Sequence, residues 1–311
     1  MSDRIFPWIV FNIFVILMLV LDLGIFHRKA HVIKIKEALV WSVAWIIIAV
    51  LFGLVVYLYR GQEAALEFLA GYLIEKTLSA DNLFVFLLVF SYFGVSPIYE
   101  HKILFWGILG ALITRAIFIA AGVALLQKFH WIIYIFGVFL VLTGIKMVLQ
   151  KEKAIHPEKN PVLKIFRRFI PVTAHYEDGH FFVKKTGRYQ ATPLFIVLLM
   201  LETTDIVFAV DSIPAVFAVT LDPFIVYTSN VFAILGLRAL YFVLAGMMRL
   251  CQSLHYGLSV ILVFLGGKMI IGDIYRIPIG IALGFIAGIL VTSIIFCNLS
   301  LWKERHKSDP G

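Results

Sequence analysis

Long apolar runs recur along almost the whole chain and restrict its fold more than any other feature. About nine runs are roughly twenty residues long or longer, the length that an α-helix needs to cross ~30 Å of hydrocarbon. Of the 311 residues, 61% are hydrophobic and 15% are charged, which is not the composition of a soluble domain. Because backbone groups in lipid must be hydrogen-bonded internally, we predict an all-α, polytopic membrane protein with a single transmembrane domain over 1–311. The predicted spans are about 6–26, 38–59, 67–94, 103–126, 131–150, 192–219, 223–247, 255–273 and 278–302.

Lysine and arginine residues gather on one side of these spans. They concentrate in the turn after the first span, in the connection over 151–191 and in the C-terminal tail. The positive-inside rule therefore predicts an N-terminus outside the cell and a cytoplasmic C-terminus. The net charge of +8 then reflects membrane topology, with the lipid bilayer as partner, and requires no nucleic acid.

The connection over 151–191 is the one long segment predicted to lie outside the membrane, on the cytoplasmic side. Its final part, 181–192, is typical of a small β-hairpin around Gly187. Just before it comes a cluster of ionisable residues that is open to two interpretations, a metal-sensing site and a polar loop without a fixed site. The second is favoured, because loops commonly carry such residues. The cluster comprises His175, Glu177, Asp178 and His180.

Two three-helix blocks, about 67–150 and about 192–273, carry the same motifs in the same order. Because each block holds an odd number of helices, the two must cross the membrane in opposite orientations, as in the inverted repeats of secondary transporters. Generic packing through small residues is the alternative, and it explains the matched glycines but not the matched charges. The matched residues are Glu75, Asp81, Asn82, Gly110, Arg115 and Lys146 in the first block and Asp205, Asp211, Ser212, Gly236, Arg238 and Lys268 in the second.

Acidic residues inside the predicted spans are the main functional signal. Each would cost roughly 2.5–3.5 kcal/mol at the centre of an inserted helix, so such residues normally face a partner or a cavity. Buried pairing with the basic residues Lys76, Arg115 and Arg238 is one interpretation, and cation binding is the other. The acids outnumber these bases, which favours cation binding. The acids are Asp22, Glu75, Asp81, Glu202, Asp205 and Asp211.

The third and sixth predicted spans run in opposite directions and carry most of these acids. We expect this arrangement to set Asp81 near the depth of Asp205, and Glu75 near the depth of Asp211. The acids would then form a pathway across the membrane between the two blocks.

Pro214 predicts a break in the sixth span. On a regular helix Ser212 shares a face with Asp205, whereas Asp211 points about a quarter-turn away from Ser212. Proline cannot donate a hydrogen bond to the carbonyl of Val210, and its ring clashes there. We therefore expect local unwinding that brings Asp211 into the site and frees a carbonyl oxygen as a ligand.

The candidate ligands are all oxygen atoms. Carboxylates, the Asn82 amide, several hydroxyls and backbone carbonyls are present, and neither histidine nor cysteine lies among them. Oxygen-only sites suit Mg²⁺, Ca²⁺ and Mn²⁺, whereas Zn²⁺ and Cu⁺ sites normally include imidazole or sulfur. The residues therefore indicate a hard divalent cation without choosing among the three.

Two acidic motifs make the chain resemble the TerC/Alx family of bacterial membrane proteins, most closely its Alx branch. They are Glu75 to Asn82 and Glu202 to Pro214, followed in order by Arg238 and by Lys268 with Met269. The resemblance runs over essentially the whole chain. It implies a member of the LysE-like exporter superfamily in the bacterial inner membrane that exports manganese from the cytoplasm, with an association to tellurium resistance and alkaline pH.

The hypothesis from the sequence is a secondary Mn²⁺ exporter rather than an enzyme, with no resident cofactor. No Gly-x-x-x-x-Gly-Lys-Ser/Thr motif is present, so proton influx is the expected energy source, since a carboxylate cannot hold a proton and a metal at once. A non-transporting scaffold for a metal or tellurite stress response is the alternative, and import and the oligomeric state stay open. The assigned roles are metal ligation by Asp81, Asn82, Asp205 and Asp211, gating or proton coupling by Glu75, Glu202 and Asp22, and charge pairing by Arg115, Arg238 and Lys76, with Arg115 and Arg238 closing the empty site.

Overall fold

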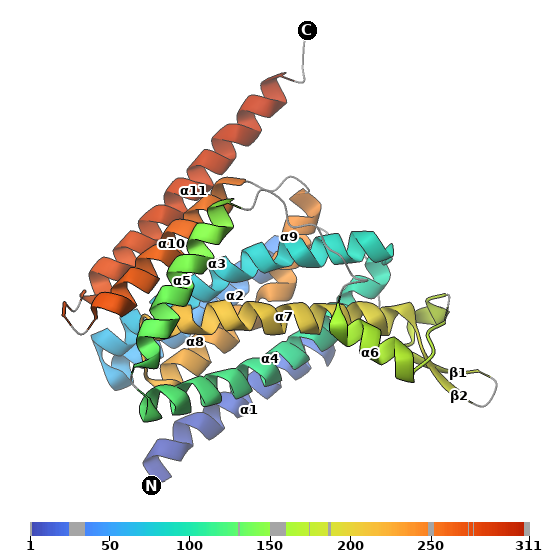
Figure 1. Ribbon diagram of the computed structural model, residues 1–311, viewed down its shortest axis with the longest axis horizontal. Coiled ribbons are helices and arrows are strands. Elements are labelled where there is room, and N and C mark those ends of the chain that lie inside the picture. The colour runs from blue at the N-terminus through green and yellow to red at the C-terminus, as the bar shows by residue number, and fades with distance from the viewer. Residues whose placement is uncertain are drawn as a thin grey trace.

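The computed structural model describes residues 2–24, 35–129, 131–149, 160–173, 175–185, 188–247, 252–272, 274–275 and 277–307. Helices dominate this part of the chain (Figure 1), and the sequence-based prediction of an all-α protein is confirmed. The helices are α1 (Ser2–Gly24), α2 (Ile35–Arg60), α3 (Gln62–Phe93), α4 (Pro97–Lys128), α5 (Ile132–Leu149), α6 (Pro161–Phe169), α7 (Pro193–Phe217), α8 (Pro223–Leu235), α9 (Leu237–Met247), α10 (Gln252–Ile271) and α11 (Ile279–Lys307).

Among the described residues, five helical segments are long and apolar enough to cross a membrane: α2, α4, α5, α7 and the segment Pro223–Ala245, which comprises α8 and most of α9. Shorter apolar helices cover Ile5–Leu21, Tyr256–Ile271 and Ile279–Ser293, within α1, α10 and α11. The remaining predicted span corresponds to α3, which carries charged residues along its length. Every predicted span therefore overlaps described helix, although residues 25, 26, 150 and 273 of these spans lie outside the described part of the chain.

The broken membrane helix is not the one that the sequence predicts. α7 stays helical through Pro214 to Phe217, so the expected unwinding at Pro214 is wrong. Pro214 removes a single hydrogen bond close to the helix end, where little helix remains to be disrupted. The break lies in the next span, where Gly236 separates α8 from α9.

A tight turn connects α3 to α4. Gly94 ends α3 in the left-handed conformation, with φ +62°, which residues with a Cβ adopt at a cost. The amide of Val95 reaches back 2.9 Å to the carbonyl of Phe90, as in a Schellman motif. Pro97 then starts α4, where its missing N–H has no helical partner to lose.

The inner helices pair between the two halves of the chain. α3 contacts α7 and α8, α4 contacts α7, and α5 contacts α10 over most of its length. Figure 1 shows α3 and α7 crossing the middle of the molecule, with α10 and α11 stacked beside α5. Small residues permit the α5–α10 approach, because Gly137 and Gly266 lie against each other's backbone.

The described part of the 151–191 connection is folded against the helices. A hairpin pairs β1 (Phe182–Lys185) with β2 (Arg188–Ala191), which confirms the predicted hairpin, although Gly187 itself lies outside the described residues. The short helix α6 is an addition to the prediction, and Figure 1 shows it beside α7. Its N-cap, Asn160, accepts hydrogen bonds from the amides of Val162 and Leu163.

The glycine contact between α5 and α10 yields a stability prediction with a matched control on the same helix. Gly266→Ala should lower the free energy of unfolding by about 1–3 kcal/mol, because the new Cβ would lie 2.5 Å from the Gly137 carbonyl oxygen. Gly267→Ala meets no atom within 4 Å and should be neutral or stabilising. Denaturation of the purified variants in detergent micelles measures both; equal stability of the two would contradict the close α5–α10 contact.

Candidate functional site

Arg115, near the middle of α4, is the centre of a buried polar cluster. Its side chain is 2% exposed and Glu75 is fully buried. One guanidinium nitrogen, Nη1, donates to a carboxylate oxygen of Glu75. Nη2 lies 3.1 Å from Oδ1 of Asp205 and Nε lies 3.5 Å from Oδ2, so Asp205 accepts from two nitrogens. One cation therefore serves two carboxylates, which come from α3 and α7.

Two neutral side chains complete the contacts of the guanidinium. Nη1 lies 3.2 Å from the hydroxyl of Ser212 and 3.0 Å from Oδ1 of Asn230, which is on α8. The Asn230 amide nitrogen in turn donates to Glu75 over 3.2 Å. Both neutral residues are buried. The cluster thus joins α3, α4, α7 and α8 through oxygen atoms that converge on a single positive group.

The pairing is the kind that a low-dielectric interior demands. A buried charge needs both an opposite charge and hydrogen bonds to offset its lost hydration. Arg115 donates to four side chains, and its two acids leave the cluster with one surplus negative charge. That surplus is a property expected of a site that receives cations.

Glu202 lies one turn before Asp205 on α7, and its carboxylate rests in a notch at Gly110 of α4. A Cβ at Gly110 would coincide with the carboxylate. No ion pair or hydrogen bond of Glu202 occurs among the described residues, and the negative charge of Asp205 acts on it electrostatically. A small cavity bounded by Phe86, Leu104 and other apolar side chains reaches Asp205. The α4–α7 contact therefore holds a third acid close to the cluster.

Buried polar groups continue along α3 on both sides of Glu75. Ser79 is fully buried one turn later, and Asn82 is buried one turn beyond it. Tyr72 is buried one turn before. The hydroxyls of Tyr72 and Ser79 have no hydrogen-bond partner within the described structure. The face of α3 that carries Glu75, Ser79 and Asn82 is therefore polar and enclosed.

The structure separates two members of the predicted four-residue metal site, Asp205 and Asp211. Asp205 binds Arg115, whereas Asp211 faces α5, where the Thr143 hydroxyl lies 3.5 Å from its Oδ1. The reason is the continuity of α7, which leaves Asp211 rotated away from the face of Asp205 and Ser212. The side chains of Asp81 and Asp22 lie outside the described residues.

The predicted depths also require correction. Glu75 lies level with Asp205, since both bind the same guanidinium, and not with Asp211. Equal depth is what the predicted inverted repeat would require of Glu75 and Asp205, which occupy matching positions in the two acidic motifs. Glu75 thus belongs to the central cluster, although the sequence assigns it to gating.

Lys76 and Arg238 contact groups other than the central acids. Nζ of Lys76 lies 3.4 Å from the carbonyl oxygen of Ala233, near the end of α8. This contact replaces the acid pairing predicted for Lys76. Nη1 of Arg238 lies 3.1 Å from Nε2 of His101, in the first turn of α4.

Two polar residues make buried or partly buried contacts that the sequence does not predict. Asn230 is a neutral residue inside the span over 223–247, and its only signal is a polar position in an apolar run. Glu67 lies at the edge of the predicted third span, where its carboxylate accepts a 2.7 Å hydrogen bond from Thr220. Lys268 is close enough to influence Glu67 electrostatically. Neither Asn230 nor Glu67 belongs to a motif that repeats in both blocks.

The connection before α7 is attached to the helix ends, and the described residues give no sign of a metal site there. The Tyr176 hydroxyl donates to the carbonyl of Phe93, and partial burial raises the pKa of Tyr176. Nζ of Lys102 donates to the carbonyl of Gly179 over 2.8 Å. Throughout the described part of the chain, no three His, Cys, Asp or Glu side chains converge as potential metal ligands. The side chain of Asp178 lies outside that part.

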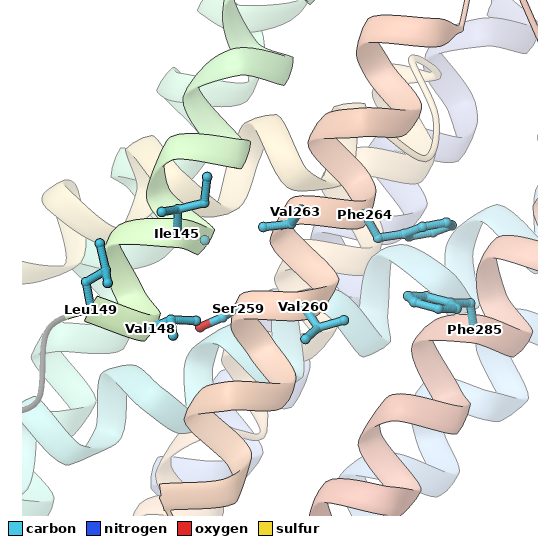
Figure 2. A pocket seen from close by; sticks show the side chains of 9 residues that line it. Ile145, Val148, Leu149, Ser259, Val260, Val263, Phe264 and Phe285 are labelled. Carbon is cyan, nitrogen blue, oxygen red and sulfur yellow. The ribbon is translucent and has the colours of Figure 1, made fainter.

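A second hollow, between α5, α10 and α11, differs from the central cluster in chemistry. Figure 2 shows apolar side chains around it, among them Ile145, Val263, Phe264 and Phe285, with Ser259 as the polar exception. Such a lining suits hydrocarbon and offers no set of ligands for an ion.

The helical segments and the buried charged cluster between them define a polytopic, all-α integral membrane protein. Residues 60–308 match the model of the "Integral membrane protein TerC family", and the chain belongs to that family. An uncharacterized membrane protein of Myxococcus xanthus is 53% identical over 96% of this chain and 93% of its own length. A protein of Escherichia coli K12 named "Putative membrane-bound redox modulator Alx" is 46% identical over 98% of this chain and 97% of its own length. A protein of Salmonella typhi with the same name is 48% identical over 96% of this chain and 95% of its own length. No solved structure matches the chain.

The ion-pair cluster predicts a non-additive effect on stability. Arg115→Met should lower the free energy of unfolding by about 3–5 kcal/mol, because it leaves two buried carboxylates uncompensated. Adding Glu75→Gln and Asp205→Asn should recover most of that loss, since no charge then remains unpaired. Denaturation of the purified variants in micelles measures each step; a triple variant less stable than Arg115→Met would disprove this electrostatic account.

Proposed function

We propose that this chain is a secondary transporter, rather than an enzyme, that exports a divalent metal cation from the cytoplasm. One observation carries the proposal. Carboxylates from α3 and α7 share a single positive group inside a bundle of membrane helices, and oxygen atoms supply every contact. Charged groups are costly in such surroundings and normally serve transport or binding there. A site that already holds a guanidinium has the charge and the ligands for a cation.

The arrangement of helices supports two inverted blocks. If the two blocks are inverted repeats, α3 corresponds to α7, α4 corresponds to α8 and α9, and α5 corresponds to α10. The contact of α3 with α8 then corresponds to the contact of α7 with α4, while the α3–α7 and α5–α10 contacts correspond to themselves. All these contacts occur, and Glu75 and Asp205 meet at the interface between the blocks, where secondary transporters bind substrate.

Manganese is the proposed substrate among hard cations. The ligands near Arg115 are carboxylate, hydroxyl and amide oxygens, which suit Mg²⁺, Ca²⁺ and Mn²⁺. The choice of Mn²⁺ rests on the resemblance to manganese exporters of the TerC/Alx family. The proposed location is the bacterial inner membrane, with the N-terminus outside and the C-terminus in the cytoplasm, as the distribution of basic residues predicts.

Export requires an energy source. Moving a divalent cation outward against an inside-negative potential costs about 4.6 kcal/mol per 100 mV, twice the value for a single charge. We propose that inward protons supply it by competing for Glu75, Asp205 and Glu202. Uptake of protons by these carboxylates would also neutralise the surplus charge of the empty cluster.

A non-transporting role is the competing function. The name of the relatives in Escherichia coli and Salmonella typhi describes a redox modulator, which is compatible with a membrane scaffold in a stress response. Cellular manganese separates the two, because deletion of an exporter must raise it, whereas deletion of a scaffold need not.

Flux through the purified protein tests the proposal. In liposomes with a pH gradient, wild-type protein should move Mn²⁺ in exchange for protons, and Asp205→Asn should reduce the rate by about 10²-fold or more, because it removes one of two buried anionic ligands. Ca²⁺ and Mg²⁺ in parallel measure selectivity. A Glu63→Gln variant, altered in the first turn of α3, serves as the control and should transport normally. Absence of flux with correctly folded wild-type protein would refute transport.

Two further acids are tested in cells. Asp81→Asn and Asp211→Asn should each abolish Mn²⁺ resistance at unchanged membrane abundance, if both acids lie on the pathway as the repeat suggests. Growth on Mn²⁺ with quantification of the protein in membranes measures this. Resistance equal to wild type in either variant would show that the substituted acid is not part of the transport pathway. The pathway would then rely on the acids around Arg115.

A further inference from the structure

Arg115 and Glu202, on opposite sides of the α4–α7 contact, differ in their numbers of polar partners. Arg115 binds two acids at once, whereas Glu202, one turn away from Asp205, has no ion pair or hydrogen bond among the described residues. An acid without a partner beside a cation that is shared between acids suggests a second position for that cation. Three residues of helix separate the two acids on α7, or about 4.5 Å along its axis.

Along the axis of α4, the Arg115 side chain extends toward the level of Glu202. Side chains on a helix tilt toward its N-terminus, which for Arg115 is the direction of Gly110. Gly110 lacks the Cβ that would collide with the Glu202 carboxylate, so the carboxylate lies directly against α4. A shift of the guanidinium by one turn along α7 would bring it from Asp205 to Glu202 without unwinding either helix.

We propose that the transported cation and the Arg115 guanidinium exchange places, with Glu202 receiving the guanidinium while the cation binds Glu75 and Asp205. This exchange rests on the proposed transport function. The oxygens left by the guanidinium, from both acids, Ser212 and Asn230, are the ligands that the cation inherits. Arg115 is then a positioning residue that closes the empty site, and Asn230 is a ligand in both states.

Charge balance favours the exchange. A divalent cation neutralises Glu75 and Asp205, and Arg115 neutralises Glu202, so the loaded cluster carries no net charge. If Arg115 stayed in place, the cation would lie beside a guanidinium and Glu202 would keep an unpaired negative charge. The total charge is the same in both arrangements, but the exchange pairs every charge locally, which is cheaper in a low-dielectric interior than two adjacent cations and a separate unpaired acid.

A double-mutant cycle on Mn²⁺ affinity tests the proposal, with calorimetric titration of the purified full-length chain in detergent. Arg115→Gln removes the internal competitor and should tighten Mn²⁺ binding by tenfold or more. Glu202→Gln should weaken binding by tenfold or more when Arg115 is present, and by less than twofold in the Arg115→Gln background. The control Asp205→Asn should weaken binding in both backgrounds. If Glu202→Gln weakens binding equally in both, Glu202 is a ligand and the exchange is wrong.

If Arg115→Gln does not fold, substitutions of two glycines on α4 test the same proposal through Mn²⁺ affinity. Gly110→Ala displaces the Glu202 carboxylate without changing any charge, and it should weaken Mn²⁺ binding about as much as Glu202→Gln. It should add nothing to a Glu202→Gln variant. Gly107→Ala, one turn earlier, places its Cβ 4.0 Å from the nearest atom, in Leu198, and should bind normally. Unchanged affinity in Gly110→Ala would overturn the proposal.

The affinity measurements separate this proposal from the function on which it rests. If the wild-type protein binds Mn²⁺ and the variants give the expected double-mutant cycle, but no flux occurs in liposomes, the proposed exchange of Arg115 and the cation is supported and the proposed export is refuted. If correctly folded wild-type protein binds no Mn²⁺, both are overturned.

Discussion

The burial of one arginine between two carboxylates organises the interior of this protein. Arg115 is on α4, and the groups it binds are on α3, α7 and α8, so four helices must meet at one depth for its charge to be satisfied. Apolar packing alone does not fix depth in a bilayer, because lipid and side chains are similarly apolar. The ion-pair cluster supplies the register that apolar contacts lack.

Much of this interior follows from the sequence, and the exceptions have identifiable causes. Run length and the need for internal backbone hydrogen bonds fix the spans, and helical periodicity places Asp205 and Ser212 on one face. The position of Asp211 was mispredicted because Pro214 lies too near the end of α7 to unwind it. The role of Asn230 depends on which helix faces α3, and spacing along a single helix cannot reveal that.

The interruption at Gly236 divides one predicted span into α8 and α9. Close to this interruption, Nζ of Lys76 donates to the carbonyl of Ala233, near the end of α8. The interruption lies next to Asn230, within the same short stretch of chain as a residue of the central cluster. Irregular backbone at such depth is tolerated where protein surrounds it, and most residues of this segment are buried.

The connection before α7 is hydrogen-bonded both to the corner between α3 and α4 and to α7 itself. Tyr176 and the Gly179 carbonyl bind the corner between α3 and α4, while Asn160, at the start of α6, donates a 3.0 Å hydrogen bond to Thr203 of α7. A displacement of α7 relative to the corner between α3 and α4 would therefore strain this connection or break one of these hydrogen bonds.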